Sequence, residues 1–210
     1  MTPEHNIEPL IEQISALISG GRQQAYRAVN AAMTATYWEI GRLIVEEEQQ
    51  GRERAEYGAY LIRLLSKRLR KEFGSGCSEQ SLWNYRQFYL QFPILSAVRR
   101  ELTWTHYRLL MRVENTSARA FYEEEAVRGA WSTRALERQI GTFYYERLLA
   151  GGDRTGMENE AKEKTAALPA SPRDFVKDPY VLEFLDIKPD HSLYERDLEQ
   201  LLMDNLQTFL

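Results

Sequence analysis

Apolar residues recur at steps of three and four from residue 7 to about residue 149, and this spacing restricts the fold more than any other feature of the sequence. The first stretch runs from Ile7 to Ile44, with the pair Gly20–Gly21 between its two halves. No segment of the region alternates convincingly between apolar and polar residues, as a half-buried strand does. The sequence therefore predicts an all-α, multi-helix domain that opens with one long helix or two stacked helices ending near Gly51.

Glycine, proline and N-capping residues divide the rest of this region into shorter helices. Ser and Thr side chains cap helix N-termini, and the residue before a proline disfavours the helical conformation. After the long helix we expect a helix from Tyr57 to the stop at Gly74, a helix capped by Ser78 and closed by Phe92–Pro93, one from Thr105 to Val113, one from Ser117 to Arg128, and a last helix capped by Ser132 that carries Leu136, Ile140, Phe143 and Leu148.

The composition changes after residue 150. Residues 151–172 are rich in Gly, Glu, Lys, Ala and Pro and contain almost no large apolar residues, which is typical of a linker. Apolar residues return in 173–210, where Leu193 to Leu206 mark an amphipathic helix. We therefore expect a helical domain in residues 1–150, a linker, and the unfinished start of a second domain in residues 173–210, which are too few for a core of their own.

The net charge of −4 conceals an uneven distribution. Residues 51–100 hold 10 Lys and Arg against 4 Asp and Glu, whereas residues 151–210 hold 7 against 13. Electrostatic fields act over about 10 Å at moderate salt, so charge matters locally. The basic segment can attract a nucleic acid although the whole chain is acidic.

Other classes of protein are disfavoured by the residue content. No run of 18 apolar residues occurs and the start of the chain lacks the pattern of a signal peptide, so we expect a cytoplasmic protein with no membrane segment. The single Cys77 excludes an internal disulfide and a zinc ribbon. The sequence contains few candidate catalytic residues. His106 is best explained as a residue at the start of a helix, and no site for a small-molecule substrate is evident.

The stretch from Tyr57 to Phe92 has the length and punctuation of a helix-turn-helix: a basic amphipathic helix, a turn at Gly74–Cys77, and a Ser-capped helix. Asn and Gln side chains read adenine edges, and Arg reads guanine or grips phosphate. The candidate DNA-binding residues are Gln80, Ser81, Asn84, Arg86 and Gln87 on the second helix, with Lys67, Arg68, Arg70 and Lys71 on the first helix for phosphate contacts. A plain helical hairpin with a solvated charged face is the alternative.

A second hairpin-like unit spans Ser117 to Leu149, but its first helix contains Glu123–Glu125, which would repel phosphate. We therefore expect this unit to serve packing or oligomerisation. The tryptophans Trp83, Trp104 and Trp131 are either stacking platforms for single strands or core residues, and aromatic residues at helical spacing favour the core.

Four runs of sequence, in order, resemble the YhcG family of bacterial proteins: residues 81–89 with Phe92–Pro93, residues 102–110, residues 131–140 and residues 177–185. The resemblance covers the chain from about residue 10 onward. It implies a helical, winged-helix-like N-terminal domain followed by a nuclease domain of the PD-(D/E)XK type, and so a protein that processes DNA.

The chain departs from this family pattern at its end. Such nucleases hold Mg²⁺ with an Asp on one strand and a Glu-x-Lys or Asp-x-Lys on the next. The sequence stops at Leu210 before either strand, so we expect no catalytic residues, no metal site and no cofactor in this chain, and Mg²⁺ only in a complete nuclease domain. Glu195 corresponds to an acidic residue of the family's opening helix and is either an accessory acid or part of a solvated face.

Two functions follow as hypotheses. The first is a DNA-binding or targeting module of a nuclease-family protein that is itself catalytically incomplete, with DNA as its partner. The alternative is a protein-interaction or dimerisation module without direct DNA contact, which would use the helix from Ile7 to Glu48 and the tail helix, and would make the chain a homodimer.

Overall fold

The computed structural model describes residues 7–50, 57–95, 98, 101–151, 156, 159, 163 and 179–184. Helices and connecting loops make up this part of the chain, with no strand in it, which confirms the all-α expectation. The elements are α1 (Glu8–Gln50), α2 (Tyr57–Phe73), the 3₁₀ helix η1 (Gly74–Cys77), α3 (Glu79–Gln91), α4 (Trp104–Leu110), α5 (Thr116–Arg128), α6 (Thr133–Gly141), α7 (Tyr144–Ala150) and α10 (Pro179–Phe184).

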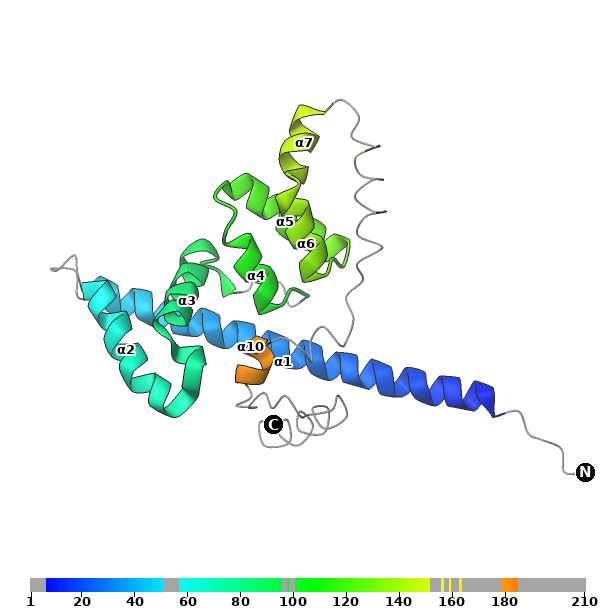
Figure 1. Cartoon of the computed structure of the whole chain (residues 1–210), viewed down its shortest axis with the longest axis horizontal. Helices are drawn as coiled ribbons and strands as arrows, with labels where there is room; N and C mark the ends of the chain where they lie inside the picture. The colour runs from blue at the N-terminus through cyan, green and yellow to red at the C-terminus, as the bar shows by residue number, and fades with distance from the viewer. Residues whose placement is uncertain are drawn as a thin grey trace, which may run out of the picture.

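Helix α1 is one uninterrupted helix of 43 residues, which at 1.5 Å per residue spans about 65 Å. The pair Gly20–Gly21 does not break it. Figure 1 shows α2, α3 and α4 gathered along the C-terminal half of α1, while its N-terminal half projects away from them. Accordingly, Met33, Tyr37 and Ile44 are buried, whereas every described residue before Ala25 is exposed.

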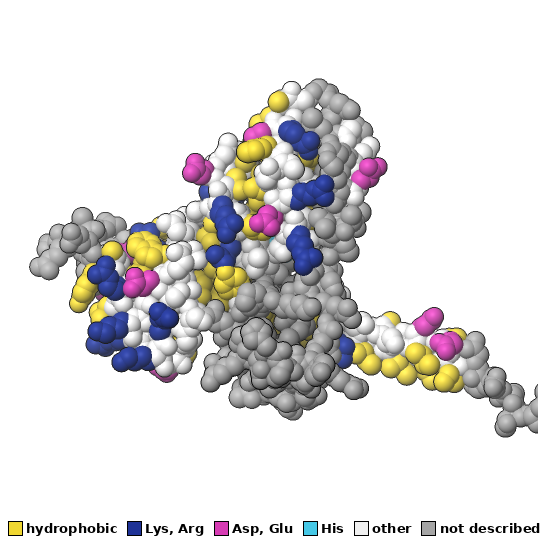
Figure 2. All heavy atoms as spheres, in the orientation of Figure 1, with side chains coloured by type: hydrophobic (Ala, Val, Ile, Leu, Met, Phe, Trp, Pro, Cys, Tyr) yellow, Lys and Arg dark blue, Asp and Glu magenta, His cyan; other side chains and the backbone are white. Residues whose placement is uncertain are grey.

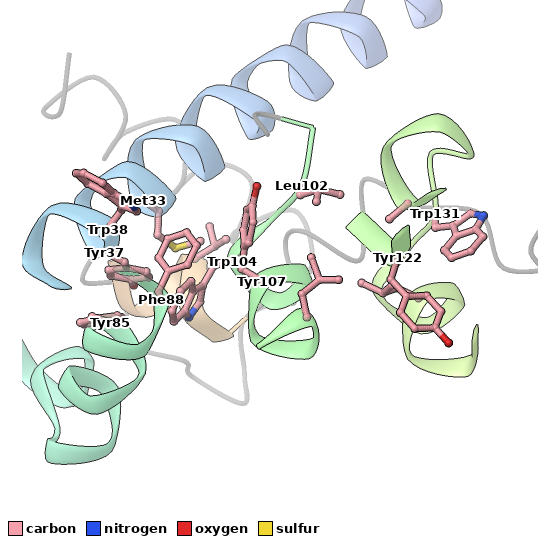
Figure 3. Packing of buried hydrophobic residues seen from close by; sticks show 14 of the residues in the cluster. Met33, Tyr37, Trp38, Tyr85, Phe88, Leu102, Trp104, Tyr107, Tyr122 and Trp131 are labelled. Atoms are coloured by element: carbon pink, nitrogen blue, oxygen red, sulfur yellow. The ribbon is translucent and has the colours of Figure 1, made fainter. Parts of the chain in front are cut away.

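The core begins where α1 crosses α3. Gly41 permits this approach, because a Cβ built on it would lie 2.0 Å from the carbonyl oxygen of Tyr85. The rings of Tyr37 and Tyr85 stack with their centroids 4.2 Å apart, and Trp104 of α4 packs edge-on at 5.0 Å from Tyr37 (Figure 3). Aromatic pairs at these separations add to the free energy gained from area burial. The long helix is therefore fixed to α3 and α4 by aromatic packing.

Helices α4 to α7 extend the same core. Tyr122, Trp131 and Tyr144 are buried there, and Tyr122 accepts a hydrogen bond from the backbone N–H of Tyr145 at 3.1 Å. Trp104 and Trp131 are 1% and 7% exposed, so both serve the core and not as stacking platforms. The unit of α5 and α6 thus contributes packing, in agreement with the sequence-based expectation.

Two helix starts differ from the expected ones. The cap of α4 is Thr103 and not Thr105: its hydroxyl accepts from the His106 backbone N–H, and the His106 ring accepts in turn from the Thr103 N–H, which forms a capping box. The cap of α5 is Asn115 and not Ser117, since the Asn115 side-chain oxygen accepts from two backbone N–H groups. In both places the residue that caps the helix lies two residues earlier in the chain than expected.

The expected last helix is divided into two. Ser132 caps α6 as expected, but α6 ends at Gly141 and α7 begins at Tyr144. Between them Phe143 adopts the left-handed conformation, with φ of 54°, and is exposed. This break turns Tyr144 inward, where its ring lies 5.7 Å from that of Phe121. The prediction of one continuous helix with Phe143 among its apolar positions was therefore wrong.

The short helix α10 packs on the helical core. Val181 is buried, and the ring of Phe184 meets that of Tyr37 edge-on at 6.0 Å. The guanidinium of Arg108 lies over the ring of Tyr180 at 4.9 Å. Most of the expected linker and the tail helix with Glu195 lie outside the described residues, so the proposed division into domains rests on sequence composition. None of the described helices combines the length and apolar content needed to cross a membrane.

Candidate nucleic-acid interface

The basic residues of α2 form an exposed face. The helix buries Leu61, Ile62 and Ser66, and its solvent side carries five basic residues against the single Glu72. Four of them, at spacings of three and four, lie on one face. These are Arg63, Lys67, Arg70 and Lys71; Arg68 lies at the edge of this row, and all five are exposed.

No ion pair joins these α2 cations to a carboxylate among the residues that the structure describes. In Figure 2 dark-blue Lys and Arg side chains gather over the end of the molecule that α2 forms in Figure 1. The face therefore presents a row of cations spaced along one helix, which suits a polyanion.

The connection from α2 to α3 is held in place by specific hydrogen bonds. Gly74 adopts a φ of 71°, which turns the chain into η1. Ser78 caps α3 by accepting from the Ser81 N–H at 3.1 Å, and the Tyr85 hydroxyl donates to the carbonyl of Gly76 at 3.0 Å. The two helices predicted for this stretch are thus present, and the 3₁₀ turn η1 joins them. No strand that would form a wing lies among the described residues.

The polar residues of α3 fall on different faces. Gln80, Asn84 and Gln87 share one face by their spacing, and the Gln80 side-chain N–H donates to the Asn84 oxygen at 3.3 Å. Ser81 is half-buried, and its hydroxyl lies 2.7 Å from that of Ser78. The first turn of α3 therefore uses one of the predicted base-reading residues for its own capping.

Arg86 projects to another side of α3, toward α1. Its Nε donates to both carboxylate oxygens of Glu48, at 2.9 and 2.7 Å, and its guanidinium lies 5.2 Å from the centroid of the Trp83 ring. Both partners of the ion pair are largely buried, with 23% and 13% of their side chains exposed. Arg86 thus links α3 to α1, an interaction that the sequence spacing did not indicate.

A hollow of about 230 Å³ lies between α3 and the C-terminal end of α4. Gln91 is one of its lining residues: its side-chain N–H donates to the Met111 carbonyl at 3.4 Å, and its side-chain oxygen is buried without a hydrogen-bond partner among the described residues. The lining residues are Asn84, Gln87, Gln91, Arg108, Met111 and Arg112. Asn84 and Gln87 were predicted; Gln91, Arg108 and Arg112 were not, although Arg108 belongs to one of the runs that carry the family resemblance.

The hollow combines amide groups, which can donate and accept, with two guanidinium groups, which only donate. This is the donor set that contacts base edges and phosphates. No group of three His, Cys, Asp or Glu residues within the described ranges is arranged to hold a metal ion. Glu195 lies outside those ranges.

The family model of the DUF1016 N-terminal domain matches residues 13–147 of this chain. The match covers more than half of the chain, so the chain belongs to this family. The match runs from the first turns of α1 into α7. The chain is also 40% identical to a protein of Escherichia coli (strain K12) named "Putative nuclease YhcG", over 92% of this chain and 59% of that protein. The chain thus spans somewhat more than half the length of this relative. No solved structure matches it significantly.

Proposed function

We propose that the helical module binds DNA and positions a nuclease domain on it. The observation that carries this proposal is the exposed row of α2 cations next to a helix that presents amides over an arginine-lined hollow. Phosphate contacts from Lys67, Arg68, Arg70 and Lys71 supply affinity, because each neutralised phosphate releases condensed counterions. These contacts also fix the register of the protein on the duplex.

Sequence reading is assigned to the face of α3 that carries Gln80, Asn84 and Gln87. Amide side chains make bidentate contacts with adenine edges, and each good pair discriminates by about 1–3 kcal/mol. Arg108 and Arg112 line the same hollow as Asn84 and Gln87 and are added to the interface as phosphate or guanine contacts. Ser81 remains in the interface as a residue that shapes the start of α3.

Arg86 is assigned a positioning role in this proposal. Its ion pair with Glu48 holds α3 against α1, so that the face with Asn84 and Gln87 stays turned outward. A direct contact of Arg86 with DNA would require loss of both bonds to Glu48. The residue is therefore needed for the interface without touching the ligand.

The nuclease part of the proposal rests on the relative's name and on the sequence resemblance. In this proposal residues 173–210 belong to a PD-(D/E)XK domain, Glu195 is an accessory acid in it, and the Mg²⁺-binding carboxylates of such a domain are not among the 210 residues. The 210-residue chain would then bind DNA without cleaving it. Cleavage of plasmid DNA by the purified chain with Mg²⁺ would contradict this part of the proposal and leave the binding part standing.

The binding itself is tested by fluorescence anisotropy with a labelled duplex at several salt concentrations. Lys67→Glu should weaken binding and reduce the slope of log K against log salt by about 1. Arg138→Glu makes the same charge change on the exposed surface of α6 and should leave the slope unchanged. If the unaltered chain shows no affinity at low salt, the DNA-binding proposal fails and the interaction-module hypothesis takes its place.

A further inference from the structure

The N-terminal part of α1 is an apolar helix surface that no described part of the chain covers. We call residues 7–24 the arm; all of them are exposed. Figure 1 shows the arm projecting from the other helices, and Figure 2 shows hydrophobic side chains in a band along it. Its large apolar side chains, between 45% and 76% exposed, are Ile7, Leu10, Ile11, Ile14, Leu17 and Ile18.

A helix in water draws most of its stability from packing one apolar face, not from intrinsic propensity. The arm has such a face, and it contains two adjacent residues of poor helix propensity, Gly20 and Gly21. A Cβ added at either glycine would meet nothing within 4 Å. The packing of the described chain therefore gives no reason for glycine at position 21, and a second surface on the arm does.

The apolar residues of the arm follow the spacing of a coiled-coil seam. Ile7, Ile11, Ile14, Ile18 and Gly21 are separated by alternating steps of four and three. In an antiparallel pair of arms, Ile14 faces the partner's Ile18 and Gly21 faces the partner's Ile11. A glycine opposite an isoleucine allows the two backbones to approach closely, which accounts for the position of Gly21.

The charges of the arm favour this antiparallel pairing over a parallel one. Glu8 and Glu12 lie near its start, and Arg22 and Arg27 lie at the end where α1 joins the core. An antiparallel partner brings Glu8 next to the partner's Arg22 at both ends of the pair, whereas a parallel partner places Glu8 level with the partner's Glu8 and pairs it with no basic residue. Opposite charges at the flanking positions of a coiled coil set the orientation of its helices.

We propose that the arm of α1 docks antiparallel on the arm of a second copy of this chain, making a symmetric dimer. The overlap of 18 residues is about 27 Å long and ends where Ala25 and Tyr26 begin to be covered by the core. Helix α2 follows the opposite end of α1 (Figure 1), so each copy keeps its basic face exposed. This dimer does not depend on DNA binding.

Sedimentation velocity on the 210-residue chain tests the proposal. The unaltered chain should dimerise at micromolar concentration, and Leu17→Lys, beside the seam near the two-fold axis, should raise the dissociation constant at least about ten-fold because it sets two ammonium groups together. Leu43→Lys is the matched control, since Leu43 is a similarly exposed leucine on the same helix outside the arm. It should leave the dissociation constant within about two-fold.

The orientation is tested by cross-linking in a Cys77→Ser background. A thiol-specific reagent should join chains carrying Glu8→Cys to chains carrying Arg22→Cys, and should not join chains that carry only Glu8→Cys. Circular dichroism checks that each variant retains its helix content. Two results overturn the proposal: a chain that stays monomeric at about 100 μM, or a dimer whose dissociation constant Leu17→Lys does not change. A monomer is also the expected result if another segment of the same chain covers the arm. Cross-linking between two Glu8→Cys chains overturns the antiparallel orientation.

Discussion

The ring of His106 in α4 reaches the carbonyl of Trp131, which precedes α6, with Nε2 and the carbonyl oxygen 3.0 Å apart. On its other side Nδ1 accepts the backbone N–H of Thr103 at 3.1 Å. A backbone N–H can only donate, so Nδ1 carries no proton and Nε2 donates to Trp131. The neutral imidazole therefore bridges two helix starts that lie 25 residues apart in the sequence.

Acid should destabilise the protein through His106. Burial lowers the pKa of this side chain below its usual 6.5. As the pH falls below about 6.5, the unfolded chain takes up a proton at this histidine that the folded chain does not, so the free energy of unfolding decreases with decreasing pH.

Urea denaturation between pH 8 and pH 5 should show this decrease, with a slope of up to about 1.4 kcal/mol per pH unit from one proton. In His106→Asn the protein should be less stable at pH 8 and the slope should be smaller by that contribution. An identical slope in the variant would show that another group causes the acid sensitivity.

The close crossing of α1 and α3 should make Gly41 intolerant of any side chain. In Gly41→Ala the methyl group meets the carbonyl of Tyr85, which is backbone and cannot rotate away, so we expect a loss of about 3 kcal/mol. Gly20→Ala is the control on the same helix, since its methyl group meets nothing and should stabilise the helix by about 0.5–1 kcal/mol. Thermal denaturation of both variants measures the difference, and equal effects would contradict so close an approach of the two helices.

The pair of Arg86 and Glu48 should contribute to stability through its largely buried position. Removing one partner leaves the other charge poorly solvated, so Arg86→Ala and Glu48→Ala should each cost about 1–3 kcal/mol. The double variant should lose less than the two single losses together. A double-mutant cycle in urea measures this coupling, and additive losses would show that the pair has no energetic role.

Arg112, which lines the hollow, should contribute to DNA affinity through its charge. Arg112 is exposed and lines the hollow, so Arg112→Glu should weaken binding and reduce the salt slope by about 1. Arg112→Lys keeps the charge and should keep the salt slope. Anisotropy measurements with both variants test whether Arg112 contacts a phosphate. If DNA does not approach Arg112, neither variant should change the slope of log K against log salt.

The local signals in the sequence predicted much of the helical pattern. The cap at Ser78, the stop at Gly74 and the apolar spacing of α2 and α3 placed both helices of the hairpin correctly. Such signals succeed because capping and amphipathic spacing act within one or two turns of helix. They failed at Thr105 and Ser117, where an earlier residue capped the helix, and at Phe143, where the chain turned so that Tyr144 could be buried.

The sequence by itself determined that this chain is all-α in its described part, that α2 carries a basic face, and that the first residues of α1 form an apolar stripe. The tertiary structure decided which of these groups meet. It paired Arg86 with Glu48, 38 residues away, joined α3 and α4 around a hollow, buried His106 between two helix starts, and left the arm of α1 uncovered by any described residue. The physical reason is that helical periodicity fixes the face on which a side chain lies, whereas the partner of that face depends on contacts between distant segments.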